Sequence, residues 1–226
     1  MTPIVLSWSG GKDSALALHT LREGGEYDVV ALLTTLSADG TVSHHGFGEA
    51  LLEAQAEAIG LPLNKIRLPA VGASAVSHAT YAQIMTEAML RWHGKGVRHV
   101  AFGDLFLEDL RRAREANLAK VGMEAVFPLW MRDTKAVAER FIASGFKAVL
   151  ASAEARLGAG FAGRPYDRAL LADLPEGTDP CGEYGEFHSF VWDGPVFSEP
   201  LPIRIGETVC AGNIYTATVA RAGEVG

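Results

Sequence analysis

The chain has 226 residues, which is the length of one large domain or of one domain with a smaller appendage. Apolar residues form 48% of the chain and charged residues 21%, as in an ordinary globular protein. The net charge of −7 argues against a general binder of nucleic acid or of anionic membranes.

The N-terminal residues and the cysteines indicate the cellular compartment in which the protein is expected. The first residues lead straight into an apolar run, so we expect no signal peptide, and no apolar run approaches the length of a membrane span. The two cysteines, Cys181 and Cys210, form no CxxC pair. A cytoplasmic protein with reduced thiols is therefore expected.

A glycine-rich turn lies between the first expected strand, residues 4–6, and the first expected helix, residues 15–21. It reads Ser9-Gly10-Gly11-Lys12-Asp13-Ser14. Two glycines let the backbone approach an anion closely, and a helix start adds unpaired N–H groups. Lys12 adds a positive charge, and the two serines add hydroxyl donors. These parts predict a polyphosphate-binding loop rather than an ordinary tight turn.

This loop differs from the Walker type. A Walker loop has Gly five residues before its Gly-Lys pair and Ser or Thr directly after the Lys. Leu6 and Asp13 stand at those two places here. The six residues instead resemble the SGGKDS signature of the PP-loop ATP pyrophosphatases, which split ATP between the α and β phosphates.

Apolar runs alternate with helical patterns along the first two thirds of the chain. Strands are expected at residues 4–6, 28–35, 63–68, 97–102, 125–127 and 148–151, and helices at 15–21, 49–59, 77–92, 107–120 and 134–143. This alternation is typical of an open parallel α/β sheet with helices on both faces. Right-handed crossovers place the loops after the strands along one rim, where ligands bind. The expected rim segments are residues 9–14, 34–47, 103–106 and 128–130.

The alternation of apolar runs and helical patterns ends at about residue 152. One helix is expected at residues 166–174, and short strands at 187–192, 196–197, 203–205 and 214–220. Alternating patterns around Asp193-Gly194-Pro195 favour antiparallel pairing. We therefore expect a nucleotide-binding α/β domain over residues 1–151 and a small C-terminal α+β appendage over residues 152–226.

The densest cluster of the tail is Asp179-Pro180-Cys181-Gly182-Glu183-Tyr184-Gly185-Glu186-Phe187-His188. Closely spaced glycines with acidic groups suit a loop whose backbone approaches a ligand. Its carboxylates would then face a cation, an amine or an ammonium ion. A solvated acidic turn explains the same residues equally well, so this cluster by itself leaves both interpretations open.

Together the two clusters resemble those of the diphthine–ammonia ligase family, a branch of the adenine nucleotide α-hydrolase-like PP-loop proteins. The glycine-rich loop identifies the superfamily, and the Gly-Glu block at this spacing is specific to the family. The resemblance runs from about residue 4 to residue 200. It also rests on four further motifs: His45-Gly46-Phe47, Gln55-Ala56-Glu57-Ala58-Ile59-Gly60-Leu61-Pro62-Leu63, Gly103-Asp104-Leu105 and Pro128-Leu129-Trp130.

The resemblance implies a Rossmann-like fold of the HUP or PP-loop type and an ATP-dependent amide synthesis. The carboxylate of diphthine, a modified His of elongation factor 2, is adenylated with loss of pyrophosphate. Ammonium then displaces AMP and leaves diphthamide. The implied cofactors are ATP and Mg²⁺, and the implied partners are ammonium and a carboxylate that a protein could carry. A homodimer is left open, and neither a membrane nor a nucleic acid is expected as a partner.

The implied site residues divide into three groups. Nucleotide contacts are expected from Ser9, Gly10, Gly11, Lys12, Asp13, Ser14, Thr34, Gly103 and Asp104. Substrate contacts are expected from His45, Trp130, Gly182, Glu183, Gly185, Glu186 and His188. The expected catalytic residues are Lys12, Asp13, Glu183 and Glu186. Lys12, with Mg²⁺ on Asp13 or Asp104, would neutralise the phosphates, and the two glutamates would hold ammonium or take its proton.

Several residues keep a structural alternative. His44 and His45 lack the further Cys or His that a zinc site needs, so loop or substrate contacts are favoured for them. Trp130 fits a ligand contact or the core, and His188 fits substrate or a structural hydrogen bond. The three arginines of the fourth helix, Arg111, Arg112 and Arg114, are expected on its solvated face.

Two other functions stay open. Sulfur transfer onto tRNA usually needs paired thiols and an RNA-binding surface, whereas this chain is acidic and has only Cys181 near the expected site. A nucleotide sensor without turnover is the second, and the intact Lys12 with both serines argues against it. The acyl substrate and the source of ammonia are left open.

Overall fold

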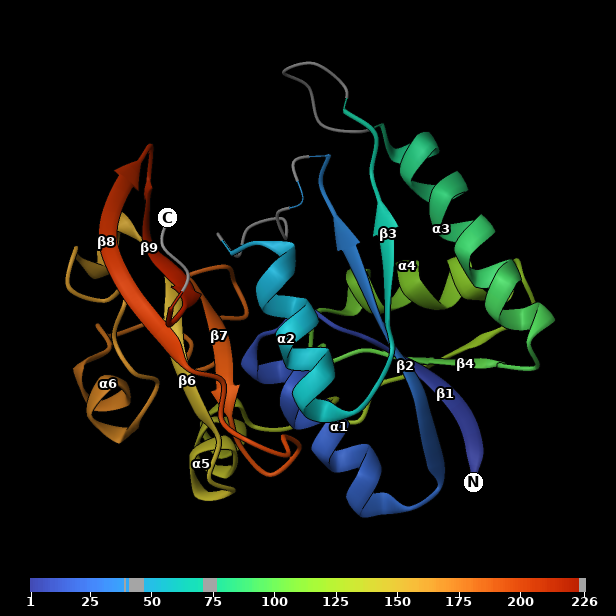
Figure 1. The fold of residues 1–226 in the computed structure, drawn as a ribbon, viewed down its shortest axis with the longest axis horizontal. Helices are drawn as coiled ribbons and strands as arrows, with labels where there is room; N and C mark the ends of the chain where they lie inside the picture. The colour runs from blue at the N-terminus through green and yellow to red at the C-terminus, as the bar shows by residue number, and fades with distance from the viewer. Residues whose placement is uncertain (39, 41–46, 71–76, 224–226) are drawn as a thin grey trace.

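The computed structural model describes residues 1–38, 40, 47–70 and 77–223. Its first part is a five-stranded sheet in the order β3-β2-β1-β4-β5, in which every neighbouring pair is parallel (Figure 1). The strands are β1 (Thr2–Ser7), β2 (Tyr27–Leu36), β3 (Leu63–Arg67), β4 (His99–Ala101) and β5 (Glu124–Val126). The associated helices are α1 (Lys12–Gly24), α2 (Glu49–Ile59), α3 (His78–Gly94), α4 (Glu108–Ala119) and α5 (Thr134–Ala143).

The chain leaves β1 in one direction to form β2 and β3, and then returns to the other side of β1 to form β4 and β5. The strand order therefore reverses between β1 and β4. In open α/β sheets, ligands bind outside the carboxyl ends of the strands at such a reversal. The topology places the candidate site there.

Two apolar clusters cover the two faces of this sheet. One contains Leu6 of β1 with Leu16 of α1 and Leu52 of α2. The other contains Val5 of β1 with Met89 of α3 and Leu118 of α4, among others. Adjacent residues of β1 thus enter opposite clusters, as the period of a strand requires. The expectation of helices on both faces is confirmed.

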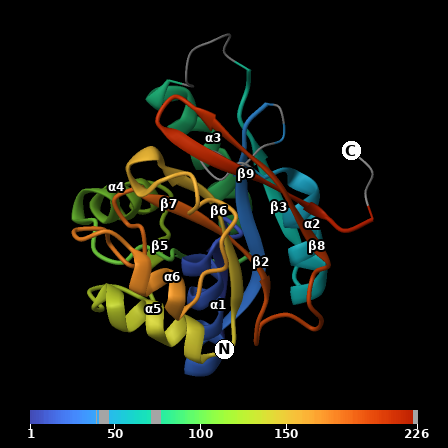
Figure 2. The ribbon, with the colours of Figure 1, turned by 90° about the vertical axis from the view of Figure 1, so that its left-hand side faces the viewer.

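The second sheet is antiparallel, in the order β7-β6-β9-β8 (Figure 2). Its strands are β6 (Lys147–Glu154), β7 (Phe187–Asp193), β8 (Ile203–Ala211) and β9 (Ile214–Arg221). Between β6 and β7 lie the 3-10 turn η1 (Ala155–Leu157) and the helix α6 (Arg168–Asp173). The additional C-terminal sheet agrees with the expected antiparallel tail.

Two details of the expected order are corrected. The strand expected at residues 148–151 does not continue the parallel series, because β6 pairs antiparallel with β7 and β9. It is buried over six of its eight residues, and a strand buried on both faces has the same apolar pattern in either kind of sheet. β6 also runs across the expected boundary at residues 151 and 152. Residues 196–197 form no strand; Phe197 N instead closes a turn onto Gly194 O at 3.0 Å.

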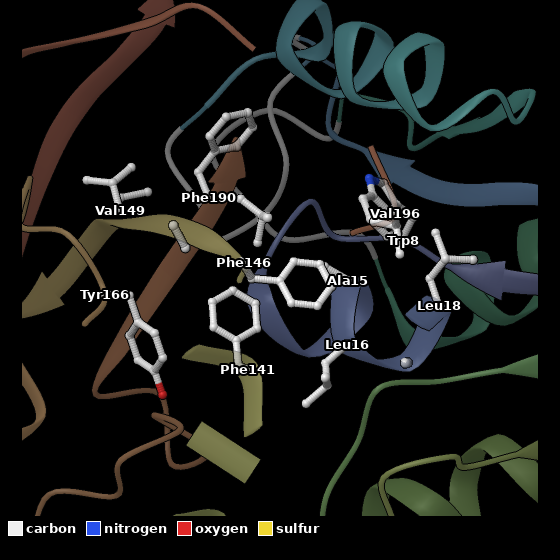
Figure 3. Packing of buried hydrophobic residues seen from close by; sticks show 14 of the residues in the cluster. Trp8, Ala15, Leu16, Leu18, Phe141, Phe146, Val149, Tyr166, Phe190 and Val196 are labelled. Carbon is white, nitrogen blue, oxygen red and sulfur yellow. The ribbon is translucent and has the colours of Figure 1, made fainter. Parts of the chain in front are cut away.

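Helix α1 lies between the two sheets. Figure 3 shows its Ala15 and Leu16 beside Phe146 and Phe141, with Phe190 of β7 in the same cluster. The rings of Phe141 and Phe146 stack at 4.8 Å between centroids. The second sheet therefore packs against the helix that opens with the glycine-rich loop. No helix within the described ranges is long and apolar enough to cross a bilayer.

Candidate functional site

A cavity of about 260 Å³ opens at the carboxyl ends of β1 and β4, where the strand order reverses. Three segments line it: the glycine-rich loop, the residues that follow β4, and the Gly-Glu block with the start of β7. Its lining comprises Ser7, Ser9, Gly11, Lys12, Asp13, Ser14, Phe102, Gly103, Asp104, Leu107, Leu110, Arg114, Cys181, Gly182, Glu183, Gly185, Phe187, His188 and Ser189. The two motifs singled out in the sequence thus form one site.

The glycine-rich loop turns sharply before α1. Gly10 has a φ of +78°, and a Cβ there would lie 2.8 Å from Gln55 Oε1, so both conformation and space require glycine. Gly11 N donates to Ser9 Oγ at 3.3 Å, and Ser14 Oγ donates to Gly11 O at 2.9 Å. Because α1 begins at Lys12, its first N–H groups lie in the loop itself.

Lys12 and Asp13 both line the cavity and form an ion pair, with Nζ 2.8 Å from Oδ2. Burial by itself lowers the pKa of Lys12, but Asp13, Cys181 and Glu183 outweigh it, and the net pKa is raised. Lys12 is therefore a permanent cation. Burial raises the pKa of Asp13, although the charge of Lys12 opposes it. Among the described residues, Asp13 Oδ1 is buried without a hydrogen-bond partner.

Glu183 faces the same cavity from the Gly-Glu block. Burial, followed by the charge of Asp13, raises the pKa of its carboxyl to about 8, while Lys12 opposes the rise. A carboxyl with this pKa exchanges protons near neutral pH, as a general base needs to. The pair Asp13 and Glu183 is the strongest acid–base feature of the site.

Glu186 does not line the cavity, although it was expected to contact substrate. Its side chain is 2% exposed. Its two oxygens accept hydrogen bonds from the backbone N–H groups of Asp179 and Tyr184, each at 3.0 Å. The carboxylate thereby holds the block in shape, so that Glu183 reaches the cavity. Gly182 and Gly185 have φ values of +69° and +86°, which fits the same tight loop.

The segment after β4 supplies a second cation. Asp104 lines the cavity, but both of its oxygens bind Arg114, at 2.5 Å from Nε and 3.1 Å from Nη2. Arg114 also lies over the ring of Phe102, 4.2 Å from its centroid. The prediction that the three arginines of α4 lie on its solvated face is therefore correct only for Arg112. Arg111 stacks on Trp130 at 4.7 Å, and Arg114 faces the cavity.

The remaining predicted residues lie in different surroundings. Trp130 does not line the cavity and packs against Phe127 and Arg111. Thr34, near the end of β2, is 1% exposed, and its hydroxyl has no partner in the described part of the chain. His188 lines the cavity beside Ser189. The expected contacts of His44 and His45 fall outside the described residues. No cluster of three His, Cys, Asp or Glu suited to a metal occurs within those residues.

One residue that lines the cavity, Ser189, and one that lies next to it, Gln55, had been given no role from the sequence. Ser189 Oγ accepts a hydrogen bond from Lys12 N at 3.1 Å, across 177 residues of sequence. Gln55 is fully buried and contacts Gly10. A small hydroxyl inside an apolar strand and a lone amide on the apolar face of a helix were the available signals, because buried polar groups are hydrogen-bonded.

Comparisons with known proteins cover nearly the whole chain. The model of the diphthamide synthase N-terminal domain matches residues 1–125, and that of the diphthamide synthase C-terminal domain matches residues 133–225. Diphthine–ammonia ligase of Danio rerio is 30% identical over 226 residues, covering 89% of this chain and 86% of that protein. Diphthine–ammonia ligase of Schizosaccharomyces pombe is 26% identical over 89% of this chain, which spans 36% of that longer protein. The solved U34-tRNA thiolase NcsA from Methanococcus maripaludis aligns with 63% of this chain and 56% of its own at 14% identity and a TM-score of 0.41.

Proposed function

The chain belongs to the diphthamide synthase family, and we propose that it is an ATP-dependent amide ligase of the diphthine–ammonia type. The reaction has two steps. A carboxylate oxygen attacks the α-phosphorus of ATP, forming an acyl-adenylate and releasing pyrophosphate. Ammonia then attacks the acyl carbon, and AMP leaves with the former carboxylate oxygen as the amide forms.

One observation carries the proposal: Lys12 and Glu183, which are 171 positions apart in sequence, line a single cavity. The first belongs to the loop suited to polyphosphate, and the second to the block suited to an ammonium ion. Adenylation and amidation both need these functions within reach of one carbonyl group. A nucleotide sensor would require only the first.

The glycine-rich loop and α4 supply the groups that would stabilise the phosphates during adenylation. Lys12 and the N–H groups at the start of α1 would neutralise charge that develops on the α-phosphate and on departing pyrophosphate. Arg114, held by Asp104, adds a second fixed cation to the lining of the cavity. Magnesium would bind Asp13, whose Oδ1 is buried and unpartnered in the described structure, and would screen the phosphates. Asp104 is committed to Arg114 and is the weaker metal ligand.

In the amidation step, Glu183 would act as the base that deprotonates ammonium. Ammonium has no lone pair until it loses a proton, and the Glu183 carboxylate can take that proton within the cavity. Its pKa of about 8 keeps it basic enough to do so near neutral pH. Glu186 supports this role by shaping the block rather than by touching substrate.

The acyl substrate we propose is diphthine on elongation factor 2, in a host that makes diphthamide. Sulfur transfer is disfavoured by the thiol that is available. Burial raises the pKa of Cys181, and its Sγ donates to Thr134 O at 3.2 Å, so it is a poor nucleophile.

Isotope transfer tests the proposal. The protein is incubated with Mg-ATP, ammonium and a substrate whose carboxylate carries ¹⁸O, and the products are analysed by mass spectrometry. One ¹⁸O atom in AMP, together with pyrophosphate and amide, is the expected result. Release of ADP and phosphate, or AMP without label, would refute adenylation of the carboxylate.

A further inference from the structure

The side chain of Gln55 lies next to the site and makes three hydrogen bonds in the protein interior. It lies in α2 and is 0% exposed. Its Oε1 accepts a hydrogen bond from Trp8 Nε1 at 2.9 Å. Its Nε2 donates to Gly10 O at 3.0 Å and to Val191 O at 2.6 Å. All three partners are buried, so water does not compete for these bonds.

The chemistry of the partners dictates the orientation of the amide. An indole N–H can only donate, and backbone carbonyl oxygens can only accept. Oε1 must therefore face Trp8, and Nε2 must face the two carbonyls. No side chain without both a donor and an acceptor can satisfy this set, which explains an amide on the apolar face of α2 among Leu51, Leu52 and Ile59.

The amide joins two segments that are 181 positions apart in sequence. Gly10 belongs to the glycine-rich loop of residues 9–14, which is called the nucleotide loop from here on. Val191 belongs to β7, which continues directly from the Gly-Glu block. Val191 N also donates to Gly10 O at 3.0 Å, and Lys12 N donates to Ser189 Oγ. The loop is therefore held from outside, by α2 and β7 at Gly10 and by β7 at Lys12.

We propose that Gln55 is a positioning residue for the nucleotide loop. Its carboxamide fixes Gly10 O in the left-handed turn, which aims Lys12 and the first N–H groups of α1 into the cavity. Because the same amide binds β7, the geometry of the nucleotide half depends on the strand that carries the acyl and ammonia half. This inference rests on the proposed function, since it assigns to the loop the binding of ATP.

Two substitutions at Gln55 and one control test the inference. Gln55→Met keeps the volume and removes all three hydrogen bonds. Gln55→Glu keeps the shape but replaces the donor with a carboxyl group. Ser198→Ala is the matched control, because Ser198 Oγ donates to Ala58 O at 2.8 Å and thus also joins α2 to the C-terminal region, away from the loop.

The first measurement is hydrogen exchange without nucleotide, which does not depend on any activity. Gln55→Met should speed exchange in peptides that cover residues 9–14, while Ser198→Ala should leave those peptides at the parent rate. Unchanged exchange at residues 9–14 in folded Gln55→Met would overturn the inference. If the parent forms no AMP, the proposed function fails, and this measurement still decides the role of Gln55.

The second measurement separates positioning from general destabilisation. Loss of folded protein lowers the apparent kcat and leaves KM for ATP unchanged. A misplaced loop instead raises KM for ATP, here by about tenfold, equivalent to roughly one buried hydrogen bond. A KM for ATP within twofold of the parent in Gln55→Met would contradict the inference.

The third measurement uses pH and also serves if Gln55→Met does not fold. Burial raises the pKa of the carboxyl introduced by Gln55→Glu. Its neutral form can accept from Trp8 and donate to one carbonyl, whereas its ionised form repels both carbonyl oxygens. KM for ATP in Gln55→Glu should therefore rise with pH more steeply than in the parent. Parallel pH dependences would overturn the inference.

Discussion

Replacing Glu183 with Gln should slow the ammonia step and abolish its pH dependence, while leaving adenylation largely intact. The carboxyl has a pKa of about 8, so about a tenth of it is ionised at pH 7, about half at pH 8 and about nine tenths at pH 9. If its ionised form takes the proton from ammonium, the rate of amide formation rises roughly tenfold between pH 7 and pH 9. A carboxamide stays neutral across this range, so the Glu183→Gln variant should lose this rise.

The assay must separate the enzyme from the titration of ammonium itself. Amide formation is measured from pH 6.5 to 9 at a constant, saturating concentration of ammonium ion, and adenylation is followed separately by exchange of labelled pyrophosphate into ATP. Glu176→Gln, an exposed acidic position outside the cavity, is the control. A parent rate that is flat with pH, or a Glu183→Gln profile that keeps the parent slope, would refute the assignment of Glu183 as the base.

The raised pKa of the Glu183 carboxyl also makes the stability of the fold depend on pH. Between the ordinary value of 4.5 and about 8, the folded state holds a proton that the unfolded state has released, so stability falls as pH rises through this window. Above pH 8 the folded state contains the ionised, partly buried carboxylate at its full cost. Glu183→Gln should therefore raise stability at pH 8.5 by roughly 2 kcal/mol, allowing for partial exposure, and leave it unchanged near pH 4. Equal thermal shifts at both pH values would contradict the raised pKa.

Three further substitutions test other parts of the site. Lys12→Ala should lower pyrophosphate release by about 100-fold or more, because it removes the buried cation of the loop; release within tenfold of the parent would argue against its role. Arg114→Met should raise KM for ATP by about tenfold, measured against the exposed Arg112→Met, and equal effects of the two would remove Arg114 from the site. Glu186→Ala should preserve ATP binding and abolish amide formation. It should also destabilise the fold by roughly 2 to 3 kcal/mol, because two backbone N–H groups lose a charged acceptor. An unchanged melting temperature, or a normal amide yield, would contradict the role of Glu186 in shaping the Gly-Glu block.

Features whose chemical groups are contiguous along the chain could be predicted from the sequence. The nucleotide loop needs two glycines, a lysine and a helix start within six residues, and all of them can be read in order. The helices at Glu49–Ile59 and Thr134–Ala143 were predicted to the residue, because their apolar period and their ends are local signals.

Which distant groups come into contact depends on the folded structure and could not be predicted from the sequence. The apolar pattern of β6 is the same in either kind of sheet, so its antiparallel partners could not be predicted from it. Glu183 and Glu186 stand three positions apart in the same block, yet one faces the cavity and the other binds backbone N–H groups, since a loop has no period from which direction follows. The roles of Gln55 and Ser189 depend on contacts across more than 100 positions, which local propensity does not encode.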